Sequence, residues 1–143
     1  LLKGGGSDNA SRVVMLAPGA GSDGVRKVVL DCVREKAANA CPPLVIGVGV
    51  GATFDKVAGL AKHALLREVG SAAKTPEAAA FERALLDEVN ATGIGPAALG
   101  GKTTALAVHV ETAPCHIAAL PVAVNMGCSA MRSASIELVS WED

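Results

Sequence analysis

The chain has 143 residues, half of them apolar, and a formal net charge of −1. This length suits one domain with a real core, and the apolar content excludes a disordered chain. Acidic and basic residues are interspersed with no run of lysine or arginine, so neither nucleic acid nor a membrane surface is expected as a partner. The longest apolar stretches also fall short of the roughly 18 residues that a membrane span requires.

The first half of the chain reads as strand, helix, strand. A glycine-rich opening, "KGGGSDN", leads to a predicted strand from Val13 to Leu16. Apolar residues at helical spacing then predict an amphipathic helix from Asp23, with Asp23 as its cap. The prolines of "NACPP" forbid helix continuation, and the apolar "LVIGVGVG" that follows is a predicted buried strand.

The second half begins with two helices and ends in strands. "TFDKVAGLAKHALLREVG" predicts a second amphipathic helix, and a third runs from Pro76 to about Val89 with Thr75 as its cap. Strands are predicted over residues 103–111, 116–125 and 135–140. This order predicts an α/β fold of the α+β kind, a mixed sheet with helices packed on it, in a single partial domain.

Two glycine-rich segments are similar to nucleotide-binding loops. In "GPAALGGKTT", Pro96 stands where a phosphate loop needs glycine, and the next residues alternate like a strand. In "GVGVGATF", Gly47 to Phe54, the third glycine comes one residue too early for a dinucleotide fingerprint. A tight turn and close helix–sheet packing are therefore the favoured interpretations, and a nucleotide-binding module remains the alternative.

The four cysteines differ in their surroundings. Reduced thiols in a cytoplasm are expected, because the chain shows no secretory feature. Cys41 and Cys128 lie at breaks in regular structure, where thiolates that bind iron–sulfur clusters are common, although no C-x-x-C motif supports this. Cys32, among helix valines, reads as core filler. Cys115 and His116 are predicted neighbours in a strand, pointing to opposite faces, and a lone histidine is usually an ordinary surface or core residue.

Five segments occur together in one order: "KGGGSDN", "NACPP", "GVGVGATFDK", "GIGPAALGGKTTALAVHVE" and "HIAALPVAVNMGCSAMR". As a set they resemble the alpha subunit, or N-terminal domain, of the class I fumarate hydratase and tartrate dehydratase family. The resemblance implies a hydro-lyase with a [4Fe–4S] cluster held by three cysteines, two of them Cys41 and Cys128. The third belongs to a C-Q-D-T-G motif upstream of the glycine-rich stretch, which this sequence does not contain.

The resemblance implies further roles. Residues 1–143 would be the C-terminal part of an alpha subunit, completed by a beta subunit or C-terminal domain in a cytoplasmic homo- or hetero-oligomer. Malate and fumarate, or tartrate, would be the substrates, with His116 catalytic and Gly5 lining the substrate pocket. Lys102, in the turn that opens a strand, either satisfies carbonyls or adds positive field toward a dianion. Without the missing parts the chain alone is expected to be inactive, and a purely structural scaffold is a further alternative.

Overall fold

The structure is a computed structural model and describes residues 1–137. Its centre is one sheet of four strands, β1 (Arg12–Leu16), β2 (Leu44–Gly51), β3 (Ala105–Ala113) and β4 (Leu120–Gly127), in the spatial order β1-β4-β2-β3. β2 and β3 are parallel, whereas β4 runs antiparallel to both of its neighbours. The predicted mixed sheet is confirmed.

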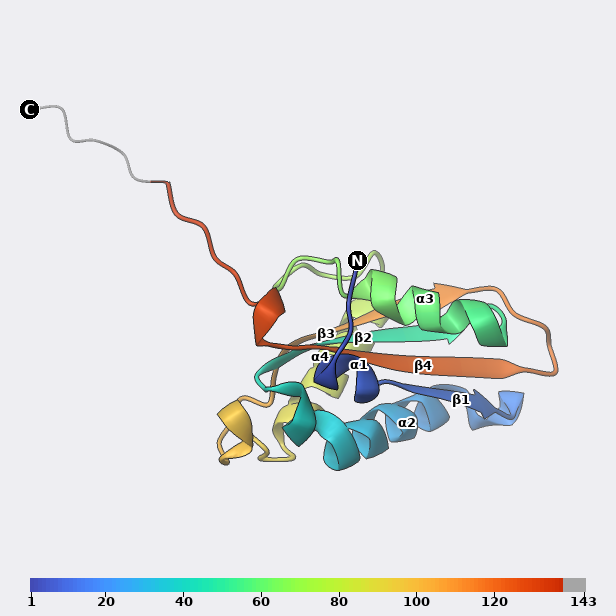
Figure 1. The fold of residues 1–143 in the computed structure, drawn as a ribbon. Helices are drawn as coiled ribbons and strands as arrows, with labels where there is room; N and C mark the ends of the chain where they lie inside the picture. Colours follow the sequence, from blue (N-terminus) through green and yellow to red (C-terminus); the bar gives the residue numbers. More distant parts are fainter. Residues whose placement is uncertain (138–143) are drawn as a thin grey trace, which may run out of the picture.

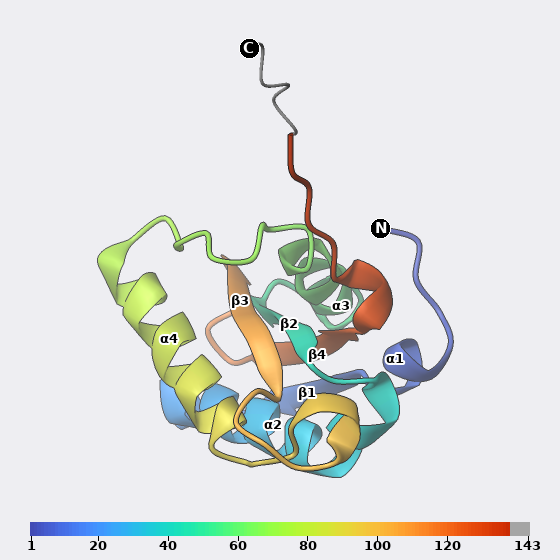
Figure 2. The same ribbon diagram turned by 90° about the vertical axis from the view of Figure 1, so that its left-hand side faces the viewer.

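Helices cover both faces of this sheet. α3 (Phe54–Ala64) lies over one face, and α2 (Gly21–Lys36) and α4 (Pro76–Asn90) lie over the other (Figures 1 and 2). Shorter turns connect them: α1 (Gly6–Asn9) and the 3₁₀ turns η1 (Pro18–Ala20), η2 (Ala37–Ala40), η3 (Pro96–Ala98) and η4 (Ser129–Met131). None of the helices within residues 1–137 is long and apolar enough to cross a membrane.

The main core lies between the sheet and the helix pair α2 and α4. Cys32 of α2 is fully buried in it, and its thiol donates to the carbonyl of Ala10 at 3.3 Å. Burial raises the pKa of this thiol, so it stays protonated. Cys32 is core filler, as predicted. The sheet and α2 contribute most of the other buried side chains, including Val25, Val28, Val29, Val33, Leu44, Ile46, Val48, Val108, Val122, Val124 and Met126.

The glycines of β2 set the packing on the opposite face. A Cβ atom at Gly47 would lie 2.1 Å from the carbonyl oxygen of Ala61, and one at Gly49 would lie 2.4 Å from that of Val57. Any side chain there would push α3 off the sheet. Close helix–sheet packing is therefore the role of these glycines. This is the interpretation that the sequence analysis favours over a nucleotide-binding turn.

Helix starts were predicted with mixed success. The Thr75 cap is confirmed, since its hydroxyl accepts the Ala78 N–H at 3.3 Å and Pro76 opens α4. Asp23 as a cap was wrong, because α2 begins at Gly21 and Asp23 lies in its first turn. A carboxylate there still favours the helix, since it faces the positive end of the helix dipole. The second predicted helix ends at Ala64, earlier than residue 70.

The predicted strands shift by a few residues. β3 ends two residues later than expected, and β4 begins at Leu120 instead of His116. Residues 114–119 form the connection between them, so Cys115 and His116 do not share a strand. Of the strand predicted over 135–140, residues 135–137 have no regular structure, and 138–140 lie outside the described residues.

Candidate functional site

Strand pairing brings Cys41 and Cys128 to one end of the sheet. Val45 of β2 pairs with Gly127, the last residue of β4. Cys41 lies just before β2 begins, and Cys128 follows Gly127 directly. Because β2 and β4 are antiparallel, the segment before β2 and the segment after β4 lie at the same end of the sheet (Figure 2). We call this the cysteine end.

Cys41 ends the η2 turn in a left-handed backbone conformation, with φ 56° and ψ 66°. Pro42 and Pro43 follow, so the chain cannot continue as a helix and turns into β2 instead. A side chain in this conformation costs on the order of 1 kcal/mol or more, and such strain is common at ligand-binding sites. The thiol of Cys41 is exposed, so a ligand can reach it.

Cys128 sits where its thiolate is stabilised. The backbone N–H of Ala130 lowers the pKa of the Cys128 thiol most, and the Ser7 hydroxyl and the Lys3 ammonium lower it further, although burial opposes them. The preceding Gly127 packs against the Met131 side chain, which would have to move for a Cβ at 127, since its sulfur would lie only 2.4 Å away. A thiolate held by N–H donors suits metal ligation.

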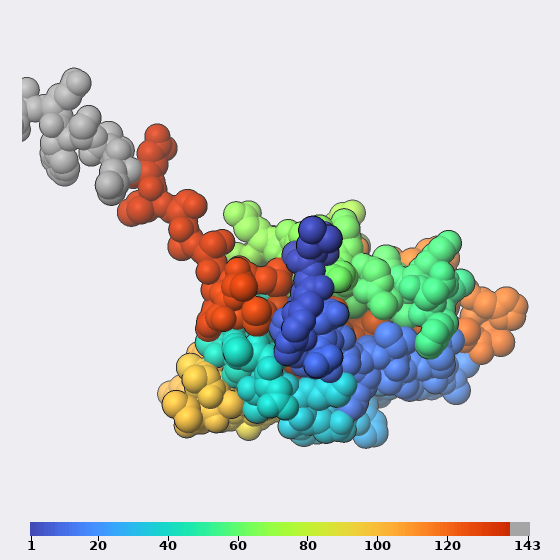
Figure 3. Space-filling view, viewed as in Figure 1, coloured from blue at the N-terminus to red at the C-terminus, as the bar shows by residue number. Residues whose placement is uncertain are grey.

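The glycine-rich N-terminal segment lies against the cysteine end. Gly6 approaches η2 closely, since a Cβ on it would lie 3.1 Å from the carbonyl oxygen of Asn39. Gly5 has φ 73°, which favours glycine, and the space where its Cβ would lie is open, as it is at Gly4. Figure 3 shows this segment, in dark blue, on the surface beside the red segment that follows β4. The backbone N–H of Gly5 has no carbonyl partner in the described part of the chain.

Lys3 is unusual for a lysine, because its side chain is only 7% exposed. Its ammonium lies 3.7 Å from the carboxylate of Asp8, too far for a hydrogen bond, and it has no hydrogen-bond partner among residues 1–137. Burial lowers the pKa of Lys3, the charges of Asp8 and Cys128 raise it, and the nearby charge of Lys62 lowers it. A buried cation therefore lies beside the Cys128 thiol.

Gly100 and Gly101 form a tight turn, with φ 89° and 134°, that leads toward β3. The Gly100 N–H donates to the Ile94 carbonyl at 2.9 Å. A strand follows, whereas a phosphate loop opens a helix, so the turn interpretation holds. The η3 segment before it donates from the Ala97 N–H to the Pro42 carbonyl at 2.9 Å, which ties this turn to the cysteine end. Lys102 is exposed there.

His116 lies at the opposite end of the sheet. It belongs to the connection between β3 and β4, which Figure 1 shows far from η4. Its exposed imidazole accepts the N–H of Ala118 at 3.1 Å through Nδ1. The whole of β4 separates His116 from Cys128, a span of about 25 Å. Within one chain, the structure brings the two cysteines, Gly5 and Lys102 to the same end and leaves His116 at the other.

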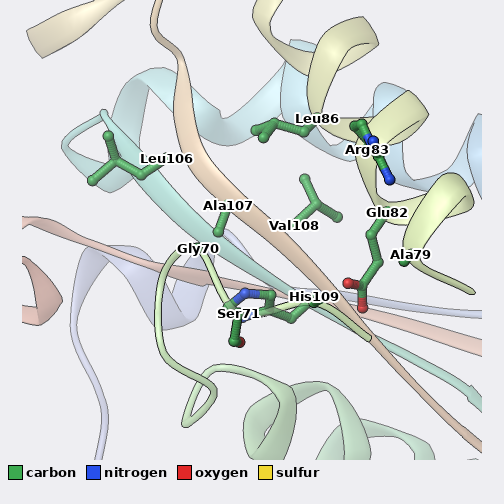
Figure 4. A pocket seen from close by; sticks show the side chains of 11 residues that line it. Gly70, Ser71, Ala79, Glu82, Arg83, Leu86, Leu106, Ala107, Val108 and His109 are labelled. Carbon is green, nitrogen blue, oxygen red and sulfur yellow. The ribbon is translucent and has the colours of Figure 1, made fainter. Parts of the chain in front are cut away.

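A cavity of about 260 Å³ lies at the outer edge of β3, between α4 and residues 70–72 (Figure 4). Glu82 is 6% exposed there, and its carboxylate accepts the Val110 N–H at 2.7 Å and pairs with Arg67. His109 is 2% exposed, and its Nδ1 has no hydrogen-bond partner in the described residues. Burial is the main cause that lowers the pKa of His109, and the charge of Arg67 lowers it further, whereas the charge of Glu82 raises it.

Sequence reasoning missed Lys3, Ser7, Glu82 and His109. Glu82 had a signal, since it occupies the same helical face as the apolar Leu85 and Val89, where a carboxylate must find partners. His109 had one too, between two valines in a strand. Nothing local marked Lys3, because two of the charged groups around it, Lys62 and Cys128, come from distant parts of the chain.

The cysteine end offers two thiols to a metal group, and the described residues contain no cluster of three or more cysteine, histidine, aspartate or glutamate side chains suited to one metal ion. One exposed thiol and one N–H-stabilised thiol at the same end of the sheet are the donor chemistry that iron–sulfur clusters use. The donors present therefore fit part of such a centre and leave its remaining ligand to come from elsewhere.

Comparisons with known proteins find clear relatives. Residues 1–137 match the family described as fumarate hydratase (Fumerase). A Methanocaldococcus jannaschii protein named "Putative L(+)-tartrate dehydratase subunit alpha" is 44% identical over 132 residues, 92% of this chain and 46% of that protein. The L(+)-tartrate dehydratase subunit alpha of Escherichia coli K12 is 38% identical over 135 residues, 94% and 45% of the two chains. The chain thus spans a little under half the length of these relatives.

Proposed function

The chain belongs to the fumarate hydratase family, and we propose that it is part of a [4Fe–4S]-dependent hydro-lyase that reversibly dehydrates a 2-hydroxy dicarboxylate. The candidate reactions are malate to fumarate and tartrate to oxaloacetate. The observation that carries this proposal is the meeting of Cys41 and Cys128 at one sheet end, beside an open glycine segment and a buried cation. The names of its relatives, which refer to tartrate dehydratase, support the substrate class.

In this proposal Cys41 and Cys128 would be two of the thiolates that hold the cluster, and a third would come from outside residues 1–143. When bound, such a cluster keeps one iron without a protein ligand and supplies a Lewis acid to a hydroxyl group. The N–H of Ala130 and the Ser7 hydroxyl lower the pKa of the Cys128 thiol, which favours the thiolate that ligation requires. Since the chain provides two of three thiolates, we propose that it is inactive by itself.

Substrate binding falls to the backbone and to charge at the same end. The N–H of Gly5 is free to donate to a carboxylate, and the open space beside Gly4 and Gly5 lets a ligand approach the backbone. The positive charge of Lys102 attracts a dianionic substrate. A hydrogen bond from the Gly100 N–H to the Ile94 carbonyl fixes the turn that carries Lys102. These groups bind and orient the substrate, whose C3 proton must leave to a base elsewhere in the enzyme.

His116 remains our candidate for a catalytic group, with one physical condition. It lies about 25 Å from the cysteines of its own chain, farther than any side chain can reach. It could serve a cysteine end only from a second copy of the chain. The relatives carry the name "subunit alpha", which supports an additional beta subunit as the partner that completes the enzyme.

The test is a hydration assay on the intact enzyme, purified anaerobically and supplied with iron and sulfide. We expect interconversion of malate and fumarate, or formation of oxaloacetate from tartrate, and loss of activity in Cys128→Ala. The matched control is Cys115→Ala, an exposed thiol at the opposite end of the sheet whose loss should leave the bound iron and sulfide unchanged. Absence of both reactions in the metal-loaded enzyme, or unchanged activity in Cys128→Ala, would overturn the proposal.

A further inference from the structure

The most anomalous polar group at the cysteine end is the ammonium of Lys3. Lysine is almost never buried without a partner, because removing its charge from water is costly. Yet its side chain is 93% buried, the complement of its 7% exposure, and Nζ has no hydrogen-bond partner within residues 1–137. An arrangement of this kind asks for an anion that satisfies the charge.

Lys3 is not simply the partner of Asp8. The two charged groups are 3.7 Å apart. Because the Asp8 side chain is 43% exposed, water solvates its carboxylate and weakens its attraction for the Lys3 ammonium. Burial is the main cause that lowers the pKa of Lys3; the charges of Asp8 and Cys128 raise it, and the charge of Lys62 on α3 lowers it.

The surroundings suit a carboxylate. Lys3 directly precedes Gly4 and Gly5, where backbone approach is open, and the free N–H of Gly5 can donate to the same ligand. The hydroxyl of Ser7, in α1, hydrogen-bonds the Cys128 thiol. A cation and an N–H donor together match one carboxylate of a small dicarboxylate.

We propose that Lys3 is a further substrate-binding residue, whose buried ammonium receives one carboxylate of a small dicarboxylate beside Cys128. This inference rests on the proposed function, because it assigns a subsite of that same centre. Lys3 and the Gly5 N–H then fix one end of the ligand, and the far carboxylate is left to other groups such as Lys102.

The experiment uses the intact, anaerobically purified enzyme and succinate, a dicarboxylate that the proposed reaction cannot convert. Calorimetric titration should show that Lys3→Met weakens succinate binding by about tenfold to a hundredfold, since a charge-assisted hydrogen bond is lost. Lys3→Arg, which keeps the charge, should bind more tightly than Lys3→Met. Lys27→Met is the control, because Lys27 is 75% exposed on α2 and should leave succinate binding unchanged.

Asp8→Asn separates binding from a merely structural role. If Lys3 and Asp8 served only to hold α1 in place, both variants would weaken succinate binding alike. With Lys3 as the anion-binding group, Asp8→Asn removes a competing carboxylate and should bind succinate as tightly as the wild type or more so. Equal weakening by both variants, or binding to Lys3→Met within about twofold of wild type, overturns the assignment.

Turnover assays on the same proteins keep the two proposals apart. Lys3-dependent succinate binding without conversion of malate or tartrate would contradict the hydro-lyase function and leave the Lys3 subsite standing. Conversion with an unchanged KM in Lys3→Met would contradict the subsite and leave the function standing. The result we expect is conversion, with KM raised in Lys3→Met more than kcat is lowered.

Discussion

Val45 at the start of β2 lies directly opposite Gly127 at the end of β4. This single pairing decides where the two candidate ligands go, because Cys41 leads into one strand and Cys128 leaves the other. The backbones pack tightly at this pairing, since a Cβ at Gly127 would lie 3.1 Å from the Val45 carbonyl oxygen. The same antiparallel arrangement sends the connection that holds His116 to the far end.

Gly49→Ala should destabilise the fold by about 1–3 kcal/mol, because the added methyl would overlap the backbone of α3. Gly59→Ala is a control on α3, the helix that packs against Gly49, with nothing within 4 Å of the new Cβ. It should stabilise the protein by roughly 0.5–1 kcal/mol through helix propensity. Urea denaturation of both variants measures the difference, and equal stabilities would refute the close-packing role of Gly49.

Glu82→Ala should cost about 3–5 kcal/mol of unfolding free energy. The change removes the acceptor of the Val110 N–H and leaves Arg67 without its buried partner. Glu77→Ala, at an exposed position in the first turn of the same helix, should cost less than about 1 kcal/mol. Thermal melts followed by circular dichroism provide the comparison; a Glu82 variant as stable as the Glu77 variant would contradict this account.

Stability should fall in mildly acidic solution because of His109. Its folded-state pKa is lowered from 6.5, so the unfolded chain binds more protons than the folded protein just below that pH. The free energy of unfolding should therefore decline as pH drops below 6.5 and continue to decline until the folded-state pKa is reached. His109→Leu should flatten this part of the profile, measured by urea denaturation at several pH values. A profile identical to wild type in the variant would rule out His109 as the cause.

The thiols should react at different rates in the metal-free protein. Cys128 has a lowered thiol pKa and is partly accessible, whereas Cys32 is fully buried with a raised one. Iodoacetamide should therefore modify Cys128 at least about tenfold faster than Cys32 at neutral pH. Ser7→Ala should slow the modification of Cys128, as peptide mass spectrometry would report. Faster labelling of Cys32 would contradict the structure.

Much of the fold was predictable because its signals are local. The Thr75 and Pro76 pair starts α4 by capping chemistry, and the apolar run of β2 marks a strand buried on both faces. The sequence predicts a strand from His116 because the apolar residues that follow it contain no glycine or polar residue to mark a turn. The chain turns at Ile117 and Ala118 instead, where the Ala119 N–H donates to the His116 carbonyl.

The candidate site was only partly predictable. The sequence indicated that Cys41 and Cys128 lie in loops, but only the register between β2 and β4 brings them both to the cysteine end. The surroundings of Lys3 are also long-range, since Lys62 and Cys128 reach it from α3 and from the end of β4. Such long-range pairings have no local pattern that spacing rules can detect.

The most direct test of the central claim is the iron and sulfide content of the intact enzyme, purified without oxygen, in single cysteine variants. The account predicts that Cys41→Ser and Cys128→Ser each lose most of the bound iron and sulfide. Cys115→Ser, changed at the opposite end of the sheet, should retain wild-type amounts. Wild-type iron in either of the first two variants would contradict the claim that both thiols ligate one cluster.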